Sequence, residues 1–174
     1  MTWKKISSKT LLTHPRITVV EDIVELPGGE QVPYLKFDES KHSASVICIR
    51  GDEVLLQKEY SYPPNEVLYQ FPGGAVEASE SPAVGAGREL TEEAGLKPKT
   101  LQELGWFYAN NRRTDRKAYV YLCADFEVVE QIGGDTEEDI TSHWTPIGRV
   151  DEMIRSGEIV NYSLLAAWAM FKAK

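Results

Sequence analysis

Residues 73–96 of this 174-residue chain read GGAVEASESPAVGAGRELTEEAGL, and this stretch decides the fold. Five residues separate Gly74 from Glu80, and seven more separate Glu80 from the run RELTEEAGL at 88–96. A glycine pair lets the backbone approach another group closely. We therefore expect a glycine loop that leads into a short acidic helix.

Three residues indicate where this helix begins and ends. Ser81 is a favourable N-cap, and Pro82 is tolerated in the first turn because its missing N–H would have no partner there. Gly95 stands where a residue in the left-handed conformation would end the helix. The expected helix therefore lies between Ser81 and Gly95.

The expected helix has two unlike faces, because successive residues are turned by about 100°. One narrow face carries small and apolar side chains, namely Ala83, Gly87, Leu90 and Ala94. The other face carries Arg88, Glu89, Glu92 and Glu93. We expect the first face to pack on the core and the carboxylates to face a cleft.

The carboxylates of this helix form a candidate metal site. Glu89 and Glu93 lie one turn apart with Glu92 beside them, so their charges repel unless a cation intervenes. Hard oxygen ligands suit Mg²⁺ or Mn²⁺, with waters and substrate phosphates completing the coordination. The alternative is a solvated acidic face that forms ion pairs with Arg88. The preceding glycines favour the metal site, because main-chain atoms can then approach a metal or phosphate.

The composition excludes some classes of partner. The formal charge is −8 and no run of lysine or arginine occurs, so a nucleic acid polymer is not expected. No stretch approaches the roughly 20 apolar residues of a membrane span, and the N-terminus lacks the pattern of a signal peptide. We expect a cytoplasmic protein that makes no membrane contact. Cys48 and Cys123 lie in apolar runs and are expected to be buried thiols.

The remaining residues predict strands before and after the acidic helix, with further helices at the end of the chain. Strands are expected at 3–9, 17–26, 31–37, 43–50, 53–60, 67–71, 101–108, 117–128 and 142–147, and helices at 149–156 and 160–172. This order favours an α/β sandwich with a mixed sheet.

The N-terminal strands form a separate module in this interpretation. Residues 1–40 are expected to be a β-hairpin module, and residues 41–174 the main domain. Such a module cannot bury both of its faces by itself. We expect Val19, Val20, Ile23 and Val24 to be exposed and to contact a second copy of the chain in a twofold homodimer.

The spacing G-x5-E-x7-R-E-U-x-E-E-x-G-U, in which U is apolar, is matched at 74–96 and resembles the motif of the Nudix hydrolases. These enzymes cleave a pyrophosphate bond in a nucleoside diphosphate linked to another moiety. The segments VELPGGE, LLQKEYSYP, GDTEEDI and SGEI make nearly the whole chain similar to the ADP-ribose and ADP-sugar pyrophosphatase branch. The resemblance implies a Nudix-type α/β/α sandwich and a small-molecule substrate.

The resemblance also implies roles for individual residues. The metal ligands would be Glu89, Glu92, Glu93 and a main-chain carbonyl near Gly73, with Gly74 close to the substrate. Arg88 would hold the carboxylates by ion pairing, Glu80 would fix the loop, and Gly95 would end the helix.

A catalytic carboxylate is expected from the acidic loop that follows the motif. Glu137 and Glu138 are the candidates beside Glu92, with Asp135 and Asp139 as alternatives.

The chain departs from the family pattern at two positions. Relatives specific for ADP-ribose commonly carry a proline downstream of the motif where this chain has Arg112, and many have an arginine where this chain has Ser61. Arg112 and Arg113 could contact substrate phosphates through charge-assisted hydrogen bonds. The alternative is that both arginines lie in a solvated loop.

The expected reaction is attack by a metal-activated water on a P–O–P bridge, in ADP-ribose or a nucleotide sugar. A nucleoside triphosphate pyrophosphohydrolase is one alternative, and a catalytically silent nucleotide-binding module is another. The intact glutamates argue against a silent module. The N-terminal module and the long acidic loop favour the nucleoside diphosphate derivative over a triphosphate.

Overall fold

The computed structural model describes residues 2–38, 41–130 and 140–174. It divides into two compact units. The N-terminal unit comprises Met1–Ser40 and Tyr108–Arg116, and the main unit comprises Lys41–Phe107 and Lys117–Lys174. The second segment of the N-terminal unit, a loop far along the chain, is one that the sequence did not assign to it.

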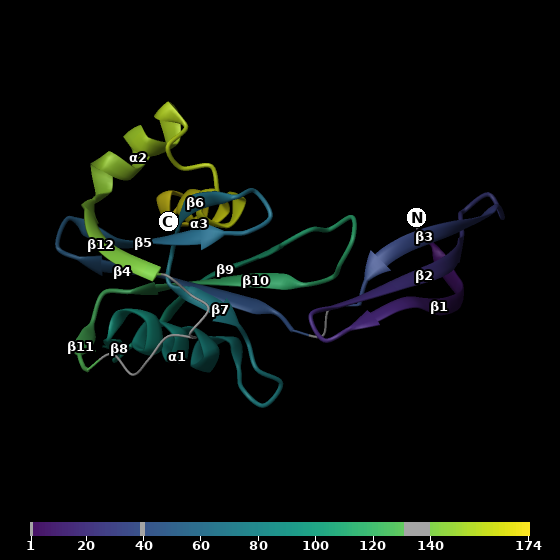
Figure 1. Cartoon of the computed structure of the whole chain (residues 1–174), viewed down its shortest axis with the longest axis horizontal. Coiled ribbons are helices and arrows are strands. Elements are labelled where there is room, and N and C mark those ends of the chain that lie inside the picture. The colour runs from purple at the N-terminus through teal and green to yellow at the C-terminus, as the bar shows by residue number, and fades with distance from the viewer. Residues whose placement is uncertain (1, 39–40, 131–139) are drawn as a thin grey trace. The chain divides into compact units, whose positions relative to one another are not determined.

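The N-terminal unit contains a three-stranded antiparallel sheet (Figure 1). Its strands are β1 (Lys4–His14), β2 (Ile17–Glu25) and β3 (Gln31–Phe37), in the order β1-β2-β3. The expected turn between β2 and β3 is present, and Gly29 adopts a positive φ of 86° there. The first strand is longer than the sequence indicated.

Two residues of this small sheet, Val20 and Asp22, are buried, and Val20 was expected to be exposed. Val20 is only 5% exposed, and the loop at 111–115 lies on the same face of the sheet, beside Asp22 and Lys36. Val19, Ile23 and Val24 are half-buried. The exposed large apolar side chains in residues 2–38 are Trp3, Ile6, Leu11, Leu12, Ile17 and Leu35. The prediction that Val20 faces a partner is therefore wrong.

The main unit is built on a mixed sheet with the strand order β12-β5-β4-β10-β9. Strand β6 pairs with β5, and β7 pairs with β4. The strands are β4 (Ser43–Arg50), β5 (Glu53–Ser61), β6 (Glu66–Gln70), β7 (Gly73–Ala75), β9 (Gln102–Tyr108), β10 (Lys117–Cys123) and β12 (Ile140–Pro146). Strand β10 runs parallel to β4, whereas β5 and β7 are antiparallel to it. A separate pair is formed by β8 (Leu96–Pro98) and β11 (Phe126–Val128).

Helices cover both faces of this sheet (Figure 1). Helix α1 (Pro82–Ala94) packs on one face, where the core includes Val46, Leu55, Ala86 and Leu90. Helices α2 (Ile147–Ser156) and α3 (Tyr162–Lys172) pack on the other, where the core includes Ile47, Leu56, Val150 and Leu164. Alternate residues of a strand point to opposite faces, which explains the division of β4 and β5 between the two cores. The predicted Nudix-type α/β/α sandwich with a mixed sheet is confirmed.

Some boundaries differ from the sequence-based expectation for physical reasons. The predicted strand 117–128 is interrupted after β10, and its last part pairs with β8 instead. Strands β7, β8 and β11 have three residues each and are too short to show an alternating pattern. Helix α3 begins later than expected, because Asn161 caps it by accepting a hydrogen bond from the Ser163 N–H at 3.1 Å.

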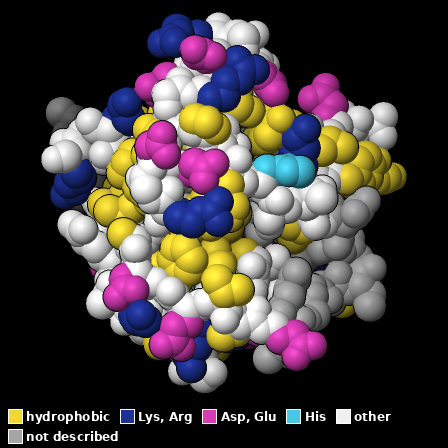
Figure 2. Space-filling model, turned by 90° about the vertical axis from the view of Figure 1, so that its left-hand side faces the viewer, with side chains coloured by type: hydrophobic (Ala, Val, Ile, Leu, Met, Phe, Trp, Pro, Cys, Tyr) yellow, Lys and Arg dark blue, Asp and Glu magenta, His cyan; other side chains and the backbone are white. Residues whose placement is uncertain are grey.

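The two cysteines are free and buried, as predicted. Cys48 on β4 and Cys123 on β10 are register partners. The hydrogen-bonding interaction with the neighbouring Cys123 thiol, together with burial, raises the pKa of Cys48. In the part of the chain that the structure describes, no helix has the length and apolar character needed to span a membrane. On the face shown in Figure 2, basic and acidic side chains are interspersed among hydrophobic ones.

Candidate active site

Helix α1 begins and ends where its sequence predicts. The Ser81 hydroxyl accepts a hydrogen bond from the Val84 N–H at 3.4 Å, and Pro82 is the first helical residue. Gly95 adopts the left-handed conformation with φ 63°, and its N–H donates to carbonyls of the last turn. The local sequence therefore determines the position of the acidic side chains along the chain.

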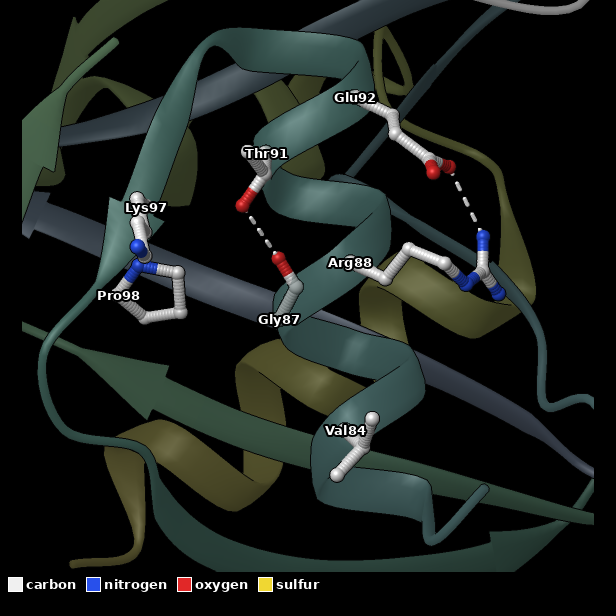
Figure 3. Close-up of a pocket in the computed structure, with 7 residues that line it drawn as sticks. All are labelled: Val84, Gly87, Arg88, Thr91, Glu92, Lys97 and Pro98. Carbon is white, nitrogen blue, oxygen red and sulfur yellow. Dashed lines mark hydrogen bonds and ion pairs between the residues drawn. The ribbon is translucent and has the colours of Figure 1, made fainter. Parts of the chain in front are cut away.

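The core-facing side of α1 differs from the prediction by one residue. Ala86 and Leu90 are fully buried, and Ala83 and Ala94 pack against the same cluster. Gly87 instead lines a pocket on the outer side of the helix, with Val84, Arg88, Thr91, Glu92, Lys97 and Pro98 (Figure 3). Gly87 and Ala86 stand three and four positions before Leu90, so both lie near its face of the helix. In the folded protein, Ala86 is the one that packs in the core. The placement of Gly87 in the core is therefore wrong.

The first carboxylate of the candidate site belongs to Glu93, which is 7% exposed. Its Oε2 accepts a hydrogen bond from the Gly73 N–H at 3.0 Å. Gly73 has φ +152°, and a Cβ at this position would lie 2.2 Å from the Ala44 carbonyl oxygen. Glycine is therefore required here, and it brings the main chain of the loop to the carboxylate.

The second carboxylate belongs to Glu89, which lies against the next glycine. A Cβ on Gly74 would lie 2.5 Å from Glu89 Oε1. Burial raises the pKa of Glu89, the pairing with Arg88 opposes this shift, and the charge of Glu92 adds to it. The site therefore holds a partly dehydrated carboxylate close to main-chain atoms of the loop.

Arg88 is the cation that these carboxylates share. Its Nη1 lies 3.0 Å from Glu89 Oε1 and 2.9 Å from Glu92 Oε2 (Figure 3 shows the second contact). Its Nη2 lies 3.0 Å from Glu80 Oε1 and donates to the Ala75 carbonyl at 3.1 Å. The pairing with Glu80 contributes most to raising the pKa of Arg88. One guanidinium thus connects three carboxylates and the loop.

Glu80 connects the loop to the helix. Its Oε1 accepts a hydrogen bond from the Glu77 N–H at 2.8 Å. A Cβ on Gly85 would lie 2.8 Å from the same atom, so the absence of a side chain there makes room for the carboxylate. Hydrogen bonds from Arg88 and from the Glu77 backbone lower the pKa of Glu80.

The donor set at the glycine pair fits a hard divalent cation. Glu89 and Glu93 bring carboxylate oxygens to the main chain at Gly74 and Gly73, and Glu92 lies beside them on the helix. Within the described residues, no three acidic, histidine or cysteine side chains form a complete metal cage. Mg²⁺ usually takes one or two protein carboxylates and completes its shell with waters and substrate phosphates.

The other predicted site residues are not described together with helix α1. Glu137 and Glu138, with the alternatives Asp135 and Asp139, fall outside the described residues. Arg112 and Arg113 belong to the N-terminal unit. Their roles toward a substrate stay predictions.

Two contributors to the site were not identified from the sequence. The Ala75 carbonyl accepts from Arg88, and the Ala44 carbonyl explains why position 73 must be glycine. Both act through main-chain atoms, so side-chain identity carries no signal for them. Only the conspicuous glycine pair indicated that something approaches the loop closely.

Comparison with known proteins places this chain in a family. The model of the NUDIX domain matches residues 40–167. A CMP-5'-(N-acetyl-N-hydroxy-3-aminopropyl)phosphonate hydrolase from Streptomyces rubellomurinus is 30% identical over 146 residues, which are 83% of this chain and 69% of that protein. An ADP-ribose pyrophosphatase from Mycobacterium tuberculosis is 30% identical over 169 residues, which are 94% of this chain and 80% of that protein.

A solved structure of an ADP compounds hydrolase has the same fold. It matches with a TM-score of 0.90 over 99% of this chain and 94% of its own, at 18% sequence identity. The chain belongs to the Nudix family. The predicted resemblance to the pyrophosphatase branch, and the expectation of a Nudix pyrophosphohydrolase, are confirmed.

Proposed function

We propose that this protein is a divalent-metal-dependent hydrolase that cleaves the pyrophosphate bond of a nucleoside diphosphate linked to another moiety. ADP-ribose-like compounds and nucleotide sugars are the proposed substrates. The observation that carries the proposal is the contact of two buried or half-buried carboxylates, Glu93 and Glu89, with the main chain of Gly73 and Gly74. Such an arrangement leaves negative charge that a cation can neutralise.

The side chains of α1 have distinct roles in this proposal. Glu89, Glu92 and Glu93, with the main chain at Gly73, hold the metal ion. A bound Mg²⁺ or Mn²⁺ supplies activation of water and neutralisation of the diphosphate charge. Arg88 keeps Glu89 and Glu92 in place, since it pairs with both.

Two further roles belong to loops. Glu80 holds the loop of the glycine pair, through its bonds to Arg88 and to the Glu77 backbone. A carboxylate of the acidic loop, Glu137 or Glu138, accepts the proton from the attacking water. Arg112 is proposed to contact a phosphate of the substrate.

A silent nucleotide-binding module is disfavoured by the same geometry. A binding module has no need for a carboxylate whose pKa is raised by burial beside two other acidic groups, as at Glu89. A nucleoside triphosphate is the second candidate substrate. The relatives favour a nucleotide joined to another group, since one is named for a CMP phosphonate and one for ADP-ribose.

The experiment is a Mg²⁺-dependent screen with identification of the products. The substrates are ADP-ribose, ADP-sugars, GDP-mannose, a CMP phosphonate ester, dinucleoside polyphosphates and nucleoside triphosphates. We expect a nucleoside monophosphate and a phosphorylated second product from the diphosphate derivatives. Release of pyrophosphate from a triphosphate as the fastest reaction would replace this proposal with the second candidate.

We also propose that two copies of the chain form a homodimer through the N-terminal unit. The support is the exposed apolar side chains of its sheet, which include Trp3, Leu11, Leu12 and Leu35. Sedimentation at micromolar concentration should give the mass of two chains. A monomer under these conditions excludes this assembly.

A further inference from the structure

The N-terminal unit contains a polar pocket of about 290 Å³. Its walls are strands β2 and β3 and the loop at 111–115, and they include Asp22, Tyr34, Lys36, Arg112, Arg113 and Thr114. All of these residues belong to the same compact unit. The pocket is therefore complete within that unit.

The strands contribute one face of their sheet to this pocket. Asp22 and Tyr34 are register partners, so their side chains lie on the same face. Lys36 is two residues further along β3 and therefore points to that face as well. Asp22 is 7% exposed and accepts a hydrogen bond from the Ser8 hydroxyl.

Hydrogen bonds to main-chain carbonyls hold the loop on this face of the sheet. The Phe37 N–H donates to the Arg113 carbonyl at 2.6 Å, and the Tyr34 hydroxyl donates to the Arg112 carbonyl at 2.7 Å. Thr114 of the loop is 9% exposed. Strand β3 therefore fixes the position of the backbone at Arg112.

The two arginines of the loop differ in what their side chains contact. Arg113 Nη1 donates to the carbonyls of Leu35 and Arg112 at 3.3 Å each, and its guanidinium lies 6.0 Å from the centre of the Tyr34 ring. These contacts brace the loop on β3. Arg113 therefore has a structural role, in contrast to the equal roles that the sequence suggested.

Arg112 has an exposed side chain in the same pocket. Among residues 2–38, 41–130 and 140–174, its guanidinium makes no hydrogen bond or ion pair, whereas its carbonyl is occupied. For Lys36, the neighbouring cation, the described part of the chain provides a single long contact of 3.7 Å, with the exposed Asp38. The pocket therefore presents donors that the protein does not use.

These donors define the chemistry of a ligand. A guanidinium offers a planar fork of N–H groups that matches two oxygens of a phosphate, and an ammonium adds a point charge. The three cations Arg112, Arg113 and Lys36 outnumber the two carboxylates of the pocket, Asp22 and Asp115. The buried carboxylate already accepts the Ser8 hydrogen bond, which moderates its repulsion of an anion.

We propose that this pocket binds a phosphate group, with Arg112 as the principal donor, Lys36 as the second cation and Arg113 as the brace of the loop. Two ligands offer this chemistry. One is the diphosphate of the substrate, in which case the inference rests on the proposed function. The other is a separate phosphorylated small molecule.

The test begins with binding in the absence of metal and turnover. Inorganic phosphate is titrated into the full chain in EDTA, and backbone amide shifts are followed by NMR. We expect saturable shifts in β3 and the 111–115 loop, about tenfold weaker binding in Arg112→Ala, and a smaller loss in Lys36→Ala. Lys9→Ala is the matched control, because it removes a cation of the same unit that does not line the pocket. Equal affinities in Arg112→Ala and the parent, no shifts in the parent, or an equal loss in Lys9→Ala overturns the proposal.

Kinetics then identify the source of the phosphate. If it belongs to the substrate, Arg112→Ala raises KM about tenfold while kcat falls less, since the contact exists in both ground and transition states. Inorganic phosphate also competes with the substrate in that case. A loss of phosphate binding without a change in KM assigns the pocket to a separate ligand. Because the binding measurement needs no turnover, an inactive preparation rejects the proposed function without affecting this result.

Discussion

Carboxylates on the two faces of the main sheet differ in how they are paired with cations. On the α1 face, Glu80, Glu89 and Glu92 share the single guanidinium of Arg88. On the opposite face, Asp151 of α2 accepts from Trp168 Nε1 at 2.7 Å and from Lys172 Nζ at 3.0 Å.

The pKa shifts follow this difference. Burial raises the pKa of Glu89, whereas the hydrogen bonds from Trp168 and Lys172 lower the pKa of Asp151. The Asp151 carboxylate has its own donors and stabilises the packing of α3 on α2. Among the described residues, three carboxylates pair with the one guanidinium of Arg88, and such a concentration of negative charge is what the proposed cation site requires.

The largest effect is expected from removing charge on the α1 face. Glu89→Gln or Glu93→Gln should reduce turnover by orders of magnitude at saturating Mg²⁺, because a neutral amide is a poor ligand for a hard cation. Thermal stability in metal-free buffer should hold or rise for Glu89→Gln, since a desolvated charge is removed. Steady-state rates and circular dichroism melting measure both quantities.

The matched control for these variants is Glu127→Gln, which removes an exposed carboxylate of β11. It should leave both rate and stability at the parent values. Full activity in either Glu89→Gln or Glu93→Gln would exclude that residue from the proposed metal site. The carboxylates of the α1 face would then have no functional difference from Asp151 on the other face.

The next effect separates the two glycines of the loop. In Gly74→Ala the new Cβ meets the end of the Glu89 side chain, which can move, so we expect a loss of activity of about 10- to 100-fold with little loss of stability. In Gly73→Ala the Cβ meets the backbone at Ala44 and φ is +152°, so unfolding should become easier by about 3 kcal/mol or more. Chemical denaturation and kinetics on both proteins distinguish the roles. Equal stabilities of the two variants would contradict this assignment.

The smallest effect is expected on the α2 and α3 face. Asp151→Asn should lower the free energy of unfolding by about 1 kcal/mol at pH 7, a value reduced for partial solvent exposure. The folded-state pKa of Asp151 is depressed, so its stabilisation is present above the unfolded pKa of about 3.9 and is lost as the pH falls through the lower folded value.

This linkage is tested by measuring the denaturation of Asp151→Asn and of its parent at roughly pH 2 to 7, a range that includes the reference aspartate pKa of about 3.9. The difference between the two proteins should shrink toward the acid end, and hydrolysis at pH 7 should be unaffected. A difference that is constant with pH would show that the ionised carboxylate contributes nothing.

Local sequence was sufficient for most of the elements and for the composition of the site. The spacing from Gly74 to Gly95 predicted the helix, its two caps and the side chains along it, because capping and helical periodicity depend on residues a few positions apart. The strands around it were predicted by alternation and apolar runs. The three-residue strands β7 and β8 were missed, since pairing with distant segments stabilises them.

Tertiary structure alone decided which contacts these residues make. The sequence placed Gly87 in the core, and packing against β4 and β10 selected Ala86 instead. It treated Arg112 and Arg113 as equivalent, whereas among the described residues the Leu35 carbonyl of β3 accepts a hydrogen bond from Arg113 and not from Arg112. The sequence by itself determined the chemical groups and their order in the chain. Their burial and their partners come from segments that are far apart in the chain, and the free energy of those contacts exists only when the sheet has formed.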